Sequence, residues 1–256
     1  MRRPVLLVDI GNTSVTLGLG RGTRVAQVAR VPTADAPGAF RSAVDGMTAG
    51  RSLAGAALCS VVPDLEHACI NAVRNAVGTA PMVISHRTPL GIGIDYPHPE
   101  TIGADRLVNA AAAAARFGAP VIVADFGTAL TFDVVSREGN YIGGVIAPGL
   151  PMMTDYLAER TALLPRIDLK GGRGAVGRST QAAMRIGARY GYRGMVRDIT
   201  AHVRRQSGMR KAALCATGGY ARWVLKDLDL PFRIEPNLTL RGLLHIFLLQ
   251  YSRGVR

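Results

Sequence analysis

Two segments of the sequence share one pattern of apolar and polar positions. VDIGNTSVTL begins at Val8, and ADFGTALTFD begins at Ala124. In each segment an apolar run ends in Asp, one apolar residue and Gly follow, and small hydroxyl-bearing residues lead into alternating positions. An apolar run indicates a buried strand and alternation with a period of two indicates another strand, so each segment predicts a β-hairpin. The repeated hairpin predicts two domains.

The rest of the pattern predicts helices and strands on either side of these hairpins. Helices are predicted at 32–50, 65–77, 104–118, from 151 onward, at 181–206 and at 240–251. Strands are predicted at 4–9, 15–19, 53–63, 82–85, 121–125, 130–134, 141–149 and 212–217. Because Val15, Leu17 and Leu19 alternate with small or polar residues, the second of these strands is expected to be buried on one face only.

The length of 256 residues fits two domains of roughly 120 to 130 residues each. No low-complexity linker separates the halves. The Ala-rich helix that ends near Gly118 is therefore predicted to connect a domain of residues 1–117 with a domain of residues 118–256.

Composition and the length of the apolar runs argue against several classes of protein. Mean hydropathy is +0.17, and stretches such as 243–249 fall short of the roughly 18 residues that a membrane span needs, so no membrane partner is expected. The short N-terminal run, residues 4–8, lacks a small-residue cleavage site and indicates a strand rather than a signal peptide. Three cysteines without a CxxC motif predict neither disulfides nor a zinc site, and they favour a reducing cytoplasm.

The net charge of +13 raises the question of nucleic-acid binding, because clustered cations gain affinity by neutralising phosphates. The basic residues are scattered singly instead of clustered, and no aromatic residues interleave them. Almost all are Arg, since the only lysines are Lys170, Lys211 and Lys226. A solvated, Arg-rich surface with no nucleic-acid partner is the expectation.

Each hairpin offers groups that suit a phosphate chain. The Asp at the strand end can hold a cation or a water, the Gly lets a ligand oxygen approach the backbone, and the following residues present N–H groups and hydroxyls. Two such hairpins facing each other would clamp a polyphosphate. Gly-Asn-Thr and Gly-Thr are also ordinary turn sequences. The second copy is what favours a binding site.

Other phosphate-binding motifs are absent or in the wrong context. No GxxxxGK[ST] occurs, which excludes a P-loop. A GxGxxG pattern is formed by Gly172, Gly174 and Gly177, with Asp198 some 20 residues further on, but no hydrophobic strand precedes it and Asp198 falls within a helical pattern. We therefore expect no dinucleotide site there. His86 and His98 have no spaced partners that would suggest a metal site.

The segment DYPHPETIGADR, residues 95–106, leads into the Ala-rich helix. Asp105 is an ordinary residue for the start of a helix, where caps and the helix dipole favour a carboxylate. The same physics would keep Asp105 ionised beside Arg106, a cation for an anionic substrate. The pattern alone leaves the structural and the functional interpretation open.

Six motifs in this order and spacing resemble the type III pantothenate kinases. They are DIGNT (9–13), YPHPETIGADR (96–106), DFGTALTFD (125–133), GGVIAPG (143–149), GRST (177–180) and TGG (217–219). The first hairpin alone would indicate only the wider actin-like and sugar-kinase superfamily. The resemblance spans nearly the whole chain.

The resemblance implies an α/β fold with mixed sheets, made of two ribonuclease-H-like, actin-type domains with the active site in the cleft between them. It implies ATP-dependent phosphorylation of pantothenate to 4'-phosphopantothenate, the first step of coenzyme A biosynthesis, by a cytoplasmic homodimer. An actin-like regulatory or assembly protein that binds nucleotide without kinase activity is the alternative. Such a protein has no need of residues 96–106, whose presence favours the kinase.

The same resemblance implies roles for individual residues. The expected ATP site consists of Asp9, Gly11, Asn12, Thr13 and Thr128. The expected pantothenate site consists of Tyr96, Gly103, Ala104, Asp105, Arg106 and Thr180, the last supplied by the partner subunit. Asp105 is the expected catalytic base. Asp125 is expected to hold a monovalent cation, K⁺ or NH₄⁺, and Mg²⁺ is expected to arrive with ATP.

Overall fold

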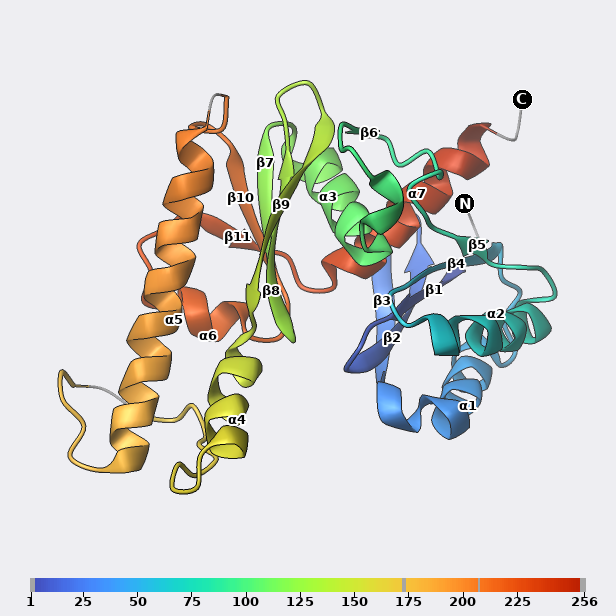
Figure 1. Cartoon of the computed structure of the whole chain (residues 1–256). Helices are drawn as coiled ribbons and strands as arrows, with labels where there is room; N and C mark the ends of the chain where they lie inside the picture. The colour runs from blue at the N-terminus through green and yellow to red at the C-terminus, as the bar shows by residue number, and fades with distance from the viewer. Residues whose placement is uncertain (1–2, 172–173, 207, 254–256) are drawn as a thin grey trace. The chain divides into compact units, whose positions relative to one another are not determined.

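The computed structural model (Figure 1) describes residues 3–171, 174–206 and 208–253 of the chain. The chain forms two compact units. The N-terminal unit contains Met1–Gly118, Gly139–Ile142 and Asn237–Arg256, and the C-terminal unit contains Ala119–Glu138 and Gly143–Pro236. The first boundary lies one residue from the expected division after residue 117. The last helix, however, belongs with the N-terminal unit rather than with residues 118–256.

A five-stranded mixed sheet forms the centre of the N-terminal unit. Its strands lie in the order β3-β2-β1-β4-β5. Their bounds are β1 Val5–Ile10, β2 Ser14–Arg21, β3 Arg24–Pro32, β4 Gly55–Ser60 and β5 Met82–Val83. Strands β1, β2 and β3 pair in antiparallel fashion, whereas β4 runs parallel to both β1 and β5. The hairpin predicted around residues 11–13 connects β1 to β2.

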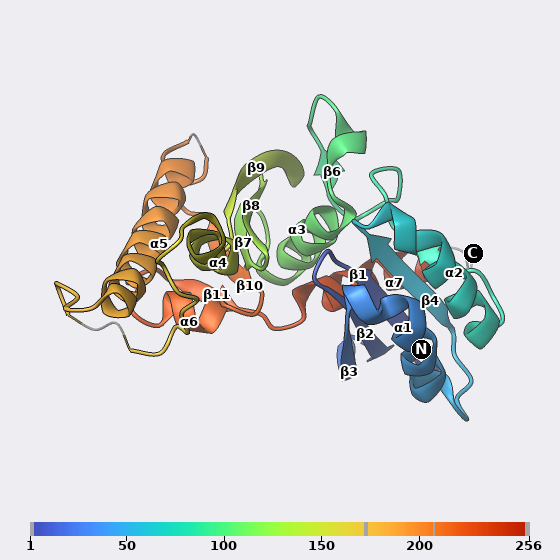
Figure 2. The ribbon, with the colours of Figure 1, turned by 60° about the horizontal axis from the view of Figure 1, so that its bottom comes forward.

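Helices cover both faces of this sheet. Figure 2 shows α1 (Ala36–Thr48) beside α2 (Pro63–Val77), and their buried side chains join one core with Leu6, Val8 and Ile10 of β1. The opposite face receives α3 (Ala104–Phe117) and α7 (Leu238–Arg253), which pack against each other (Figure 1).

Glycines in β2 allow α7 to lie close to the sheet. A Cβ atom on Gly20 would come within 2.6 Å of Leu244 Cδ1, and one on Gly18 within 2.8 Å of Leu240 Cδ1. The expectation that β2 is buried on one face only is therefore wrong, since residues 15–20 are all buried. An alternating pattern shows which side chains are apolar and which are polar or small. It does not show that the small residues of β2 are also buried, because the helix that covers them, α7, is distant in sequence.

A short strand completes the N-terminal unit. Strand β6 (Gly93–Ile94) pairs in parallel with Asn140 and Tyr141, the first residues of β9, and a 3₁₀ helix (Pro99–Thr101) follows it. The segment before α3, which the sequence pattern left irregular, is therefore fixed by strand pairing.

The C-terminal unit repeats the strand order of the N-terminal unit. Its strands lie in the order β11-β10-β7-β8-β9, with β7 in the place of β1. Their bounds are β7 Val121–Phe126, β8 Ala129–Val135, β9 Asn140–Pro148, β10 Ala213–Thr217 and β11 Phe232–Ile234. The helices are α4 Leu150–Arg160, α5 Thr180–Arg205 and α6 Ala221–Leu225. Helix α5 packs against α4 and α6. The duplication predicted from the two hairpins extends to the whole topology.

Four strands and α-helices of the described chain escaped the sequence pattern: β3, β6, β11 and α6. Strand β3 is an edge strand whose residues are mostly exposed, so it carries little apolar periodicity. The other three are short. Among the described residues between α4 and α5, residues 161–171 and 174–179, there is no strand that could precede a dinucleotide motif, and Asp198 lies within α5. Gly172 of that GxGxxG pattern lies outside the described residues. Of the helices in the described part of the chain, none has the length and apolar character needed to cross a lipid bilayer.

Candidate active site

The two hairpins place their carboxylates in equivalent positions. Asp9 is the last residue but one of β1, and Asp125 is the last but one of β7. After each strand the glycine N–H closes the turn: Gly11 donates to the Ser14 carbonyl at 3.1 Å, and Gly127 donates to a carbonyl two residues on, also at 3.1 Å. Each Asp also faces a threonine across the antiparallel pair. Similar sequences have produced similar local geometry.

The first turn is held from outside by the chain that follows β3. The Thr33 hydroxyl donates to the Gly11 carbonyl at 2.6 Å, and the Thr33 N–H donates to the Thr13 carbonyl at 3.0 Å. Asn12 and Thr13 are exposed at the tip. The turn therefore presents an amide and a hydroxyl on a fixed backbone, which is the arrangement expected of a phosphate-binding loop.

The second turn is surrounded by glycine backbone. Gly218, in the left-handed region with φ +91°, would bring a Cβ within 2.6 Å of Asp125 Oδ1. A Cβ on Gly149, just before α4, would overlap the carbonyl oxygen of Thr128. Thr128 itself is exposed. The TGG and GGVIAPG motifs thus supply the close approach of backbone to Asp125 and Thr128 that only glycine permits.

A buried hydroxyl lies in the same part of the C-terminal unit. Tyr192 of α5 is fully buried, and its hydroxyl has no hydrogen-bond partner among the described residues. Burial raises the pKa of Tyr192, the negative charge of Asp125 raises it further, and the Leu150 N–H acts in the opposite direction without reaching hydrogen-bond geometry. A buried polar atom without a partner calls for a water or an ion.

These groups fit a monovalent cation better than a transition metal. No group of three or more His, Cys, Asp or Glu side chains in the described part of the chain could hold a metal ion. One carboxylate, Asp125, with a nearby hydroxyl and exposed backbone is instead an all-oxygen set with low charge, which suits a hard cation.

In the N-terminal unit, Tyr96 and Arg106 are brought together by a residue from β9. Tyr141 is fully buried, and the Tyr96 ring meets its edge at a centroid distance of 6.2 Å. The Arg106 guanidinium lies over the same ring at 6.0 Å. The Asp95 N–H donates to the Tyr141 carbonyl at 2.9 Å and fixes the chain next to Tyr96. Tyr141 therefore organises two residues that the sequence placed in the substrate site.

Asp105 lies in the first turn of α3, in contact with backbone at the helix start. The Arg106 N–H donates to Asp105 Oδ1 at 2.8 Å, and a Cβ on Gly103, the N-cap, would come within 2.6 Å of the same oxygen. Ala104 and Asp105 are both half-buried. Burial raises the pKa of Asp105 above its ordinary value, while the Arg106 N–H and guanidinium lower it less. The helix start does favour the ionised form, but desolvation outweighs it.

A thiol that the sequence reasoning did not select lies next to Asp9. Asp9 and Cys59 are paired neighbours in the parallel strands β1 and β4, and Cys59 Sγ donates to Asp9 Oδ1 at 3.5 Å. Parallel pairing of two strands that both end at this edge is the signal that could have identified it.

Thr180 begins α5 in the C-terminal unit. The Ser179 hydroxyl caps this helix by accepting from the Ala182 N–H at 3.2 Å, and Thr180 is exposed beside it. A Cβ on Gly177 would overlap the backbone of Ala183, so the GRST motif fixes a tight entry into the helix.

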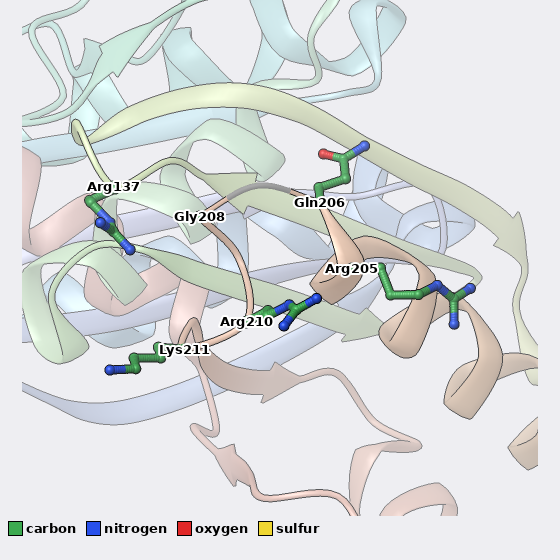
Figure 3. Close-up of a pocket in the computed structure, with 6 residues that line it drawn as sticks. All are labelled: Arg137, Arg205, Gln206, Gly208, Arg210 and Lys211. Carbon is green, nitrogen blue, oxygen red and sulfur yellow. The ribbon is translucent and has the colours of Figure 1, made fainter.

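A basic pocket of about 530 Å³ lies elsewhere in the C-terminal unit (Figure 3). Its lining residues are Arg137, Arg205, Gln206, Gly208, Arg210 and Lys211. None of the expected site residues lines it. Figure 3 shows Arg205 and Gln206 pointing away from Arg137, so the side chains do not converge on a single position for a ligand.

The duplicated sheets define a protein of the actin-like and sugar-kinase fold class. A glucokinase of the ROK family from Streptomyces griseus, solved with glucose and AMPPNP, superposes with a TM-score of 0.54 at 17% identity over 96% of this chain and 98% of its own. A Baf family protein of Campylobacter jejuni, described as a transcriptional activator, superposes with a TM-score of 0.62 at 17% identity over 96% and 99%. At these identities the likeness concerns the fold alone, and it confirms the expected fold class.

The chain belongs to the type III pantothenate kinase family. Residues 5–202 match the family model. A type III pantothenate kinase of Akkermansia muciniphila is 42% identical over 239 residues, which cover 93% of this chain and 96% of that protein. One of Methylacidiphilum infernorum is 39% identical over 245 residues, covering 93% and 86%. The resemblance seen in the six motifs is thus confirmed, and the chain is a kinase.

Proposed function

We propose that this chain transfers the γ-phosphoryl group of ATP to the primary hydroxyl of pantothenate, giving 4'-phosphopantothenate and ADP, the first step of coenzyme A biosynthesis. The observation that carries the proposal is the arrangement around α3, where Asp105 begins the helix and Arg106 and Tyr96 share one buried ring, Tyr141. A nucleotide-binding switch or filament subunit has no use for this acceptor segment.

ATP is assigned to the hairpins. The exposed turn residues, Asn12 and Thr13 in one unit and Thr128 in the other, supply N–H groups and hydroxyls for the phosphate oxygens, with Gly11 allowing close approach. Asp9 would hold the hydrated Mg²⁺ that arrives with ATP, which would neutralise phosphate charge there. Phosphoryl transfer depends mainly on such positioning and on neutralisation of the phosphate charge, because its transition state is loose.

Asp105 is assigned as the base. The hydroxyl oxygen of pantothenate forms a bond to the γ-phosphorus, the bond to the β–γ bridging oxygen breaks, and the hydroxyl proton passes to Asp105. Because burial raises the pKa of Asp105, its carboxylate holds a proton more firmly than an exposed Asp would. General bases of this kind contribute about 10²- to 10⁴-fold to the rate.

The pantothenate site is assigned to the same segment. Arg106 is a cation for the pantothenate carboxylate, the Tyr96 ring packs against the aliphatic part, and the backbone of Gly103 and Ala104 admits the ligand close to Asp105. The contacts of Arg106 and Tyr96 with Tyr141 pre-organise both side chains.

Asp125, with the Tyr192 hydroxyl nearby, is assigned to a monovalent cation, K⁺ or NH₄⁺. When bound, this cation supplies positive charge beside the phosphates, a part that lysine plays in P-loop proteins. None of the proposed site residues in this chain is a lysine.

We further propose a homodimer in which Thr180 of the partner subunit completes the pantothenate site. The C-terminal unit exposes large apolar side chains on α4, on α5 and around them: Ile146, Met152, Tyr156, Leu157, Leu163, Val176 and Tyr190. Such surfaces are typical of interfaces.

Light scattering should give twice the mass of one chain, and Tyr156→Glu with Leu157→Glu should give monomers that lose activity. A monomeric, active wild type would contradict the dimer. All three cysteines lie among the described residues as buried thiols outside any disulfide, which fits work in a reducing cytoplasm.

The test combines ATP, Mg²⁺ and pantothenate with the purified chain in potassium and in sodium buffer, with phosphopantothenate measured by mass spectrometry. We expect product in potassium, less in sodium, and almost none with Asp105→Asn. If ATP binds but no product forms in either buffer, the hairpins serve another acceptor or a nucleotide-dependent switch, and the proposal fails.

A further inference from the structure

A buried thiol lies on the face of the N-terminal sheet that carries Asp9 and is covered by α3, the helix of Asp105. Side chains alternate along β1, so Leu6, Val8 and Ile10 join the core under α1 and α2 while Asp9 points to the opposite face. On β4, Ala56 and Leu58 join that same core, which leaves Cys59 on the face of Asp9. This is the face that α3 covers.

The thiol is in contact with one carboxylate and within electrostatic range of the other. Cys59 is directly paired with Asp9 in the parallel register, and its Sγ lies 3.5 Å from Asp9 Oδ1, a distance at which S–H donates to a carboxylate. Cys59 is fully buried, and the charges of both Asp9 and Asp105 act on it.

Cys59 is expected to keep the proton that a hydrogen-bond donor needs. Burial raises the pKa of Cys59 well above its ordinary value, and the charges of Asp9 and Asp105 and the hydrogen bond to Asp9 raise it further. The thiol therefore stays neutral and keeps its proton at physiological pH. A second anion beside the two carboxylates is avoided, and the half-buried Asp9 receives a donor from a fully buried side chain.

We propose that Cys59 is a positioning residue for the kinase reaction, whose S–H fixes the carboxylate of Asp9 in the orientation in which it meets ATP. The inference rests on the proposed function through the role of Asp9 toward ATP. Cys59 touches no substrate and takes no part in proton transfer. It acts through Asp9, and no redox or nucleophilic chemistry is assigned to it.

The test compares Cys59→Ala and Cys59→Ser with the wild type. Cys59→Ala removes the donor, so we expect kcat/KM for ATP to fall about three- to tenfold, the range for loss of one weak hydrogen bond to a charged group. The KM for pantothenate should stay within about twofold, since Arg106 and Tyr96 are untouched. Cys59→Ser retains a donor on a similar side chain and should recover most of the loss.

Cys69→Ala is the matched control. Cys69 is also a buried thiol of the N-terminal unit, on α2, where burial raises its pKa to about 11 and it has no hydrogen bond to a carboxylate. The Cys69→Ala variant should have a lower Tm than the wild type but an unchanged kcat/KM for ATP. If Cys59→Ala and Cys59→Ser are impaired equally, or if Cys59→Ala is impaired no more than Cys69→Ala, the positioning role is overturned and Cys59 only packs.

A failure of the proposed function is distinguishable from a failure of this inference. If the wild type makes no phosphopantothenate, calorimetric titration with MgATP replaces the kinetic assay. The inference then predicts weaker MgATP binding by Cys59→Ala, recovery with Cys59→Ser, and no change with Cys69→Ala. Equal affinities for all four proteins would overturn it.

Discussion

The two hairpins place an Asp at the same position, opposite a threonine and two residues before a Gly, but they differ in turn length and in what lies next to the carboxylate. Beside Asp9, the parallel strand supplies Cys59, whose side chain donates to the carboxylate. Beside Asp125, the parallel strand supplies Thr217 and then Gly218, whose backbone lies against the carboxylate. The strand next to Asp9 thus contributes a side chain, and the strand next to Asp125 leads into glycine backbone.

This difference arises because different helices and turns pack next to the hairpin in each unit. The N-terminal unit brings the start of α3 to the same face, with Asp105 and Arg106, whereas the C-terminal unit brings glycine turns and the buried hydroxyl of Tyr192. Duplication has kept the Asp-x-Gly turn, which short-range sequence defines, and the neighbouring strands and helices have diverged. In our proposal, the first set of residues serves the acceptor and the second serves a cation.

The largest expected effect comes from neutralising the carboxylate of each hairpin, which should show that the two have different roles. Asp9→Asn should lower kcat/KM for ATP about 10²- to 10³-fold in potassium and in sodium alike, because the carboxylate that would hold the hydrated Mg²⁺ of ATP is lost. Asp125→Asn should lower activity in potassium to the level seen in sodium. Steady-state kinetics in both buffers measures this. An Asp125→Asn protein that still responds to potassium would show that the cation binds elsewhere.

The glycine environment of Asp125 can be tested with two adjacent residues. Gly218→Ala places a methyl group 2.5 Å from the Phe126 carbonyl carbon and 2.6 Å from Asp125 Oδ1, on a backbone with φ +91°, so the end of β7 that carries the carboxylate must shift. We expect about a 10- to 100-fold loss of activity in potassium, as for other misplacements near 1 Å. Gly219→Ala is the control, because its Cβ would have no atom within 4 Å. Equal activity of the two variants would refute the packing argument.

Short-range patterns predicted the parts of this molecule that short-range forces determine. Both hairpins, the helix at α3 and the topology-defining duplication follow from apolar runs, alternation and turn residues. Strand β3 was missed because an exposed edge strand carries little apolar signal, and the burial of β2 was underestimated because α7, distant in sequence, covers its glycines. Tertiary packing of this kind is not encoded in local periodicity.

The candidate site divides in the same way. Asp9, Asp105 and Asp125 stand out in the sequence because each ends an apolar run or lies in the first turn of a helix, within a recognisable motif. Tyr141 and Cys59 do not, since an apolar or small residue in a strand has the same local pattern whether it packs in a core or contacts a functional group. Strand pairing places Cys59 next to Asp9 and Tyr141 next to Ile94. This pairing, which the local sequence does not reveal, brings the two residues to the candidate site.

The side-chain environment of the N-terminal unit is tested by Tyr141→Leu. Loss of the ring removes the edge contact with Tyr96 and the cation–π contact with Arg106. We expect the KM for pantothenate to rise about 10- to 30-fold with the KM for ATP unchanged, because two contacts of up to about 1 kcal/mol each are lost. Tyr251→Leu, which removes a stacked pair with Phe247 in the same unit, should leave both constants unchanged. A rise in both KM values for Tyr141→Leu would indicate general loss of structure.

The smallest effect concerns the stability cost of Asp105 itself. Its pKa is raised in the folded protein by burial, so the folded state holds this proton more firmly than the unfolded state does. Stability therefore falls as pH rises from the ordinary value near 3.8 through the folded-state pKa, and above that pKa the carboxylate carries the whole cost. Asp105→Asn cannot ionise and still accepts the Arg106 N–H, so its Tm should exceed that of the wild type at pH 7, with a difference that shrinks toward pH 4. Differential scanning fluorimetry across this pH range measures the difference in Tm. Substitution of the exposed Asp198 by Asn is the control, and its Tm should match that of the wild type at pH 7.

A lower Tm for Asp105→Asn at pH 7 would mean that the carboxylate stabilises the start of α3 more than its burial costs. Asp105 would then be an ordinary helix-start residue, like many others, rather than a group kept at the expense of stability for catalysis.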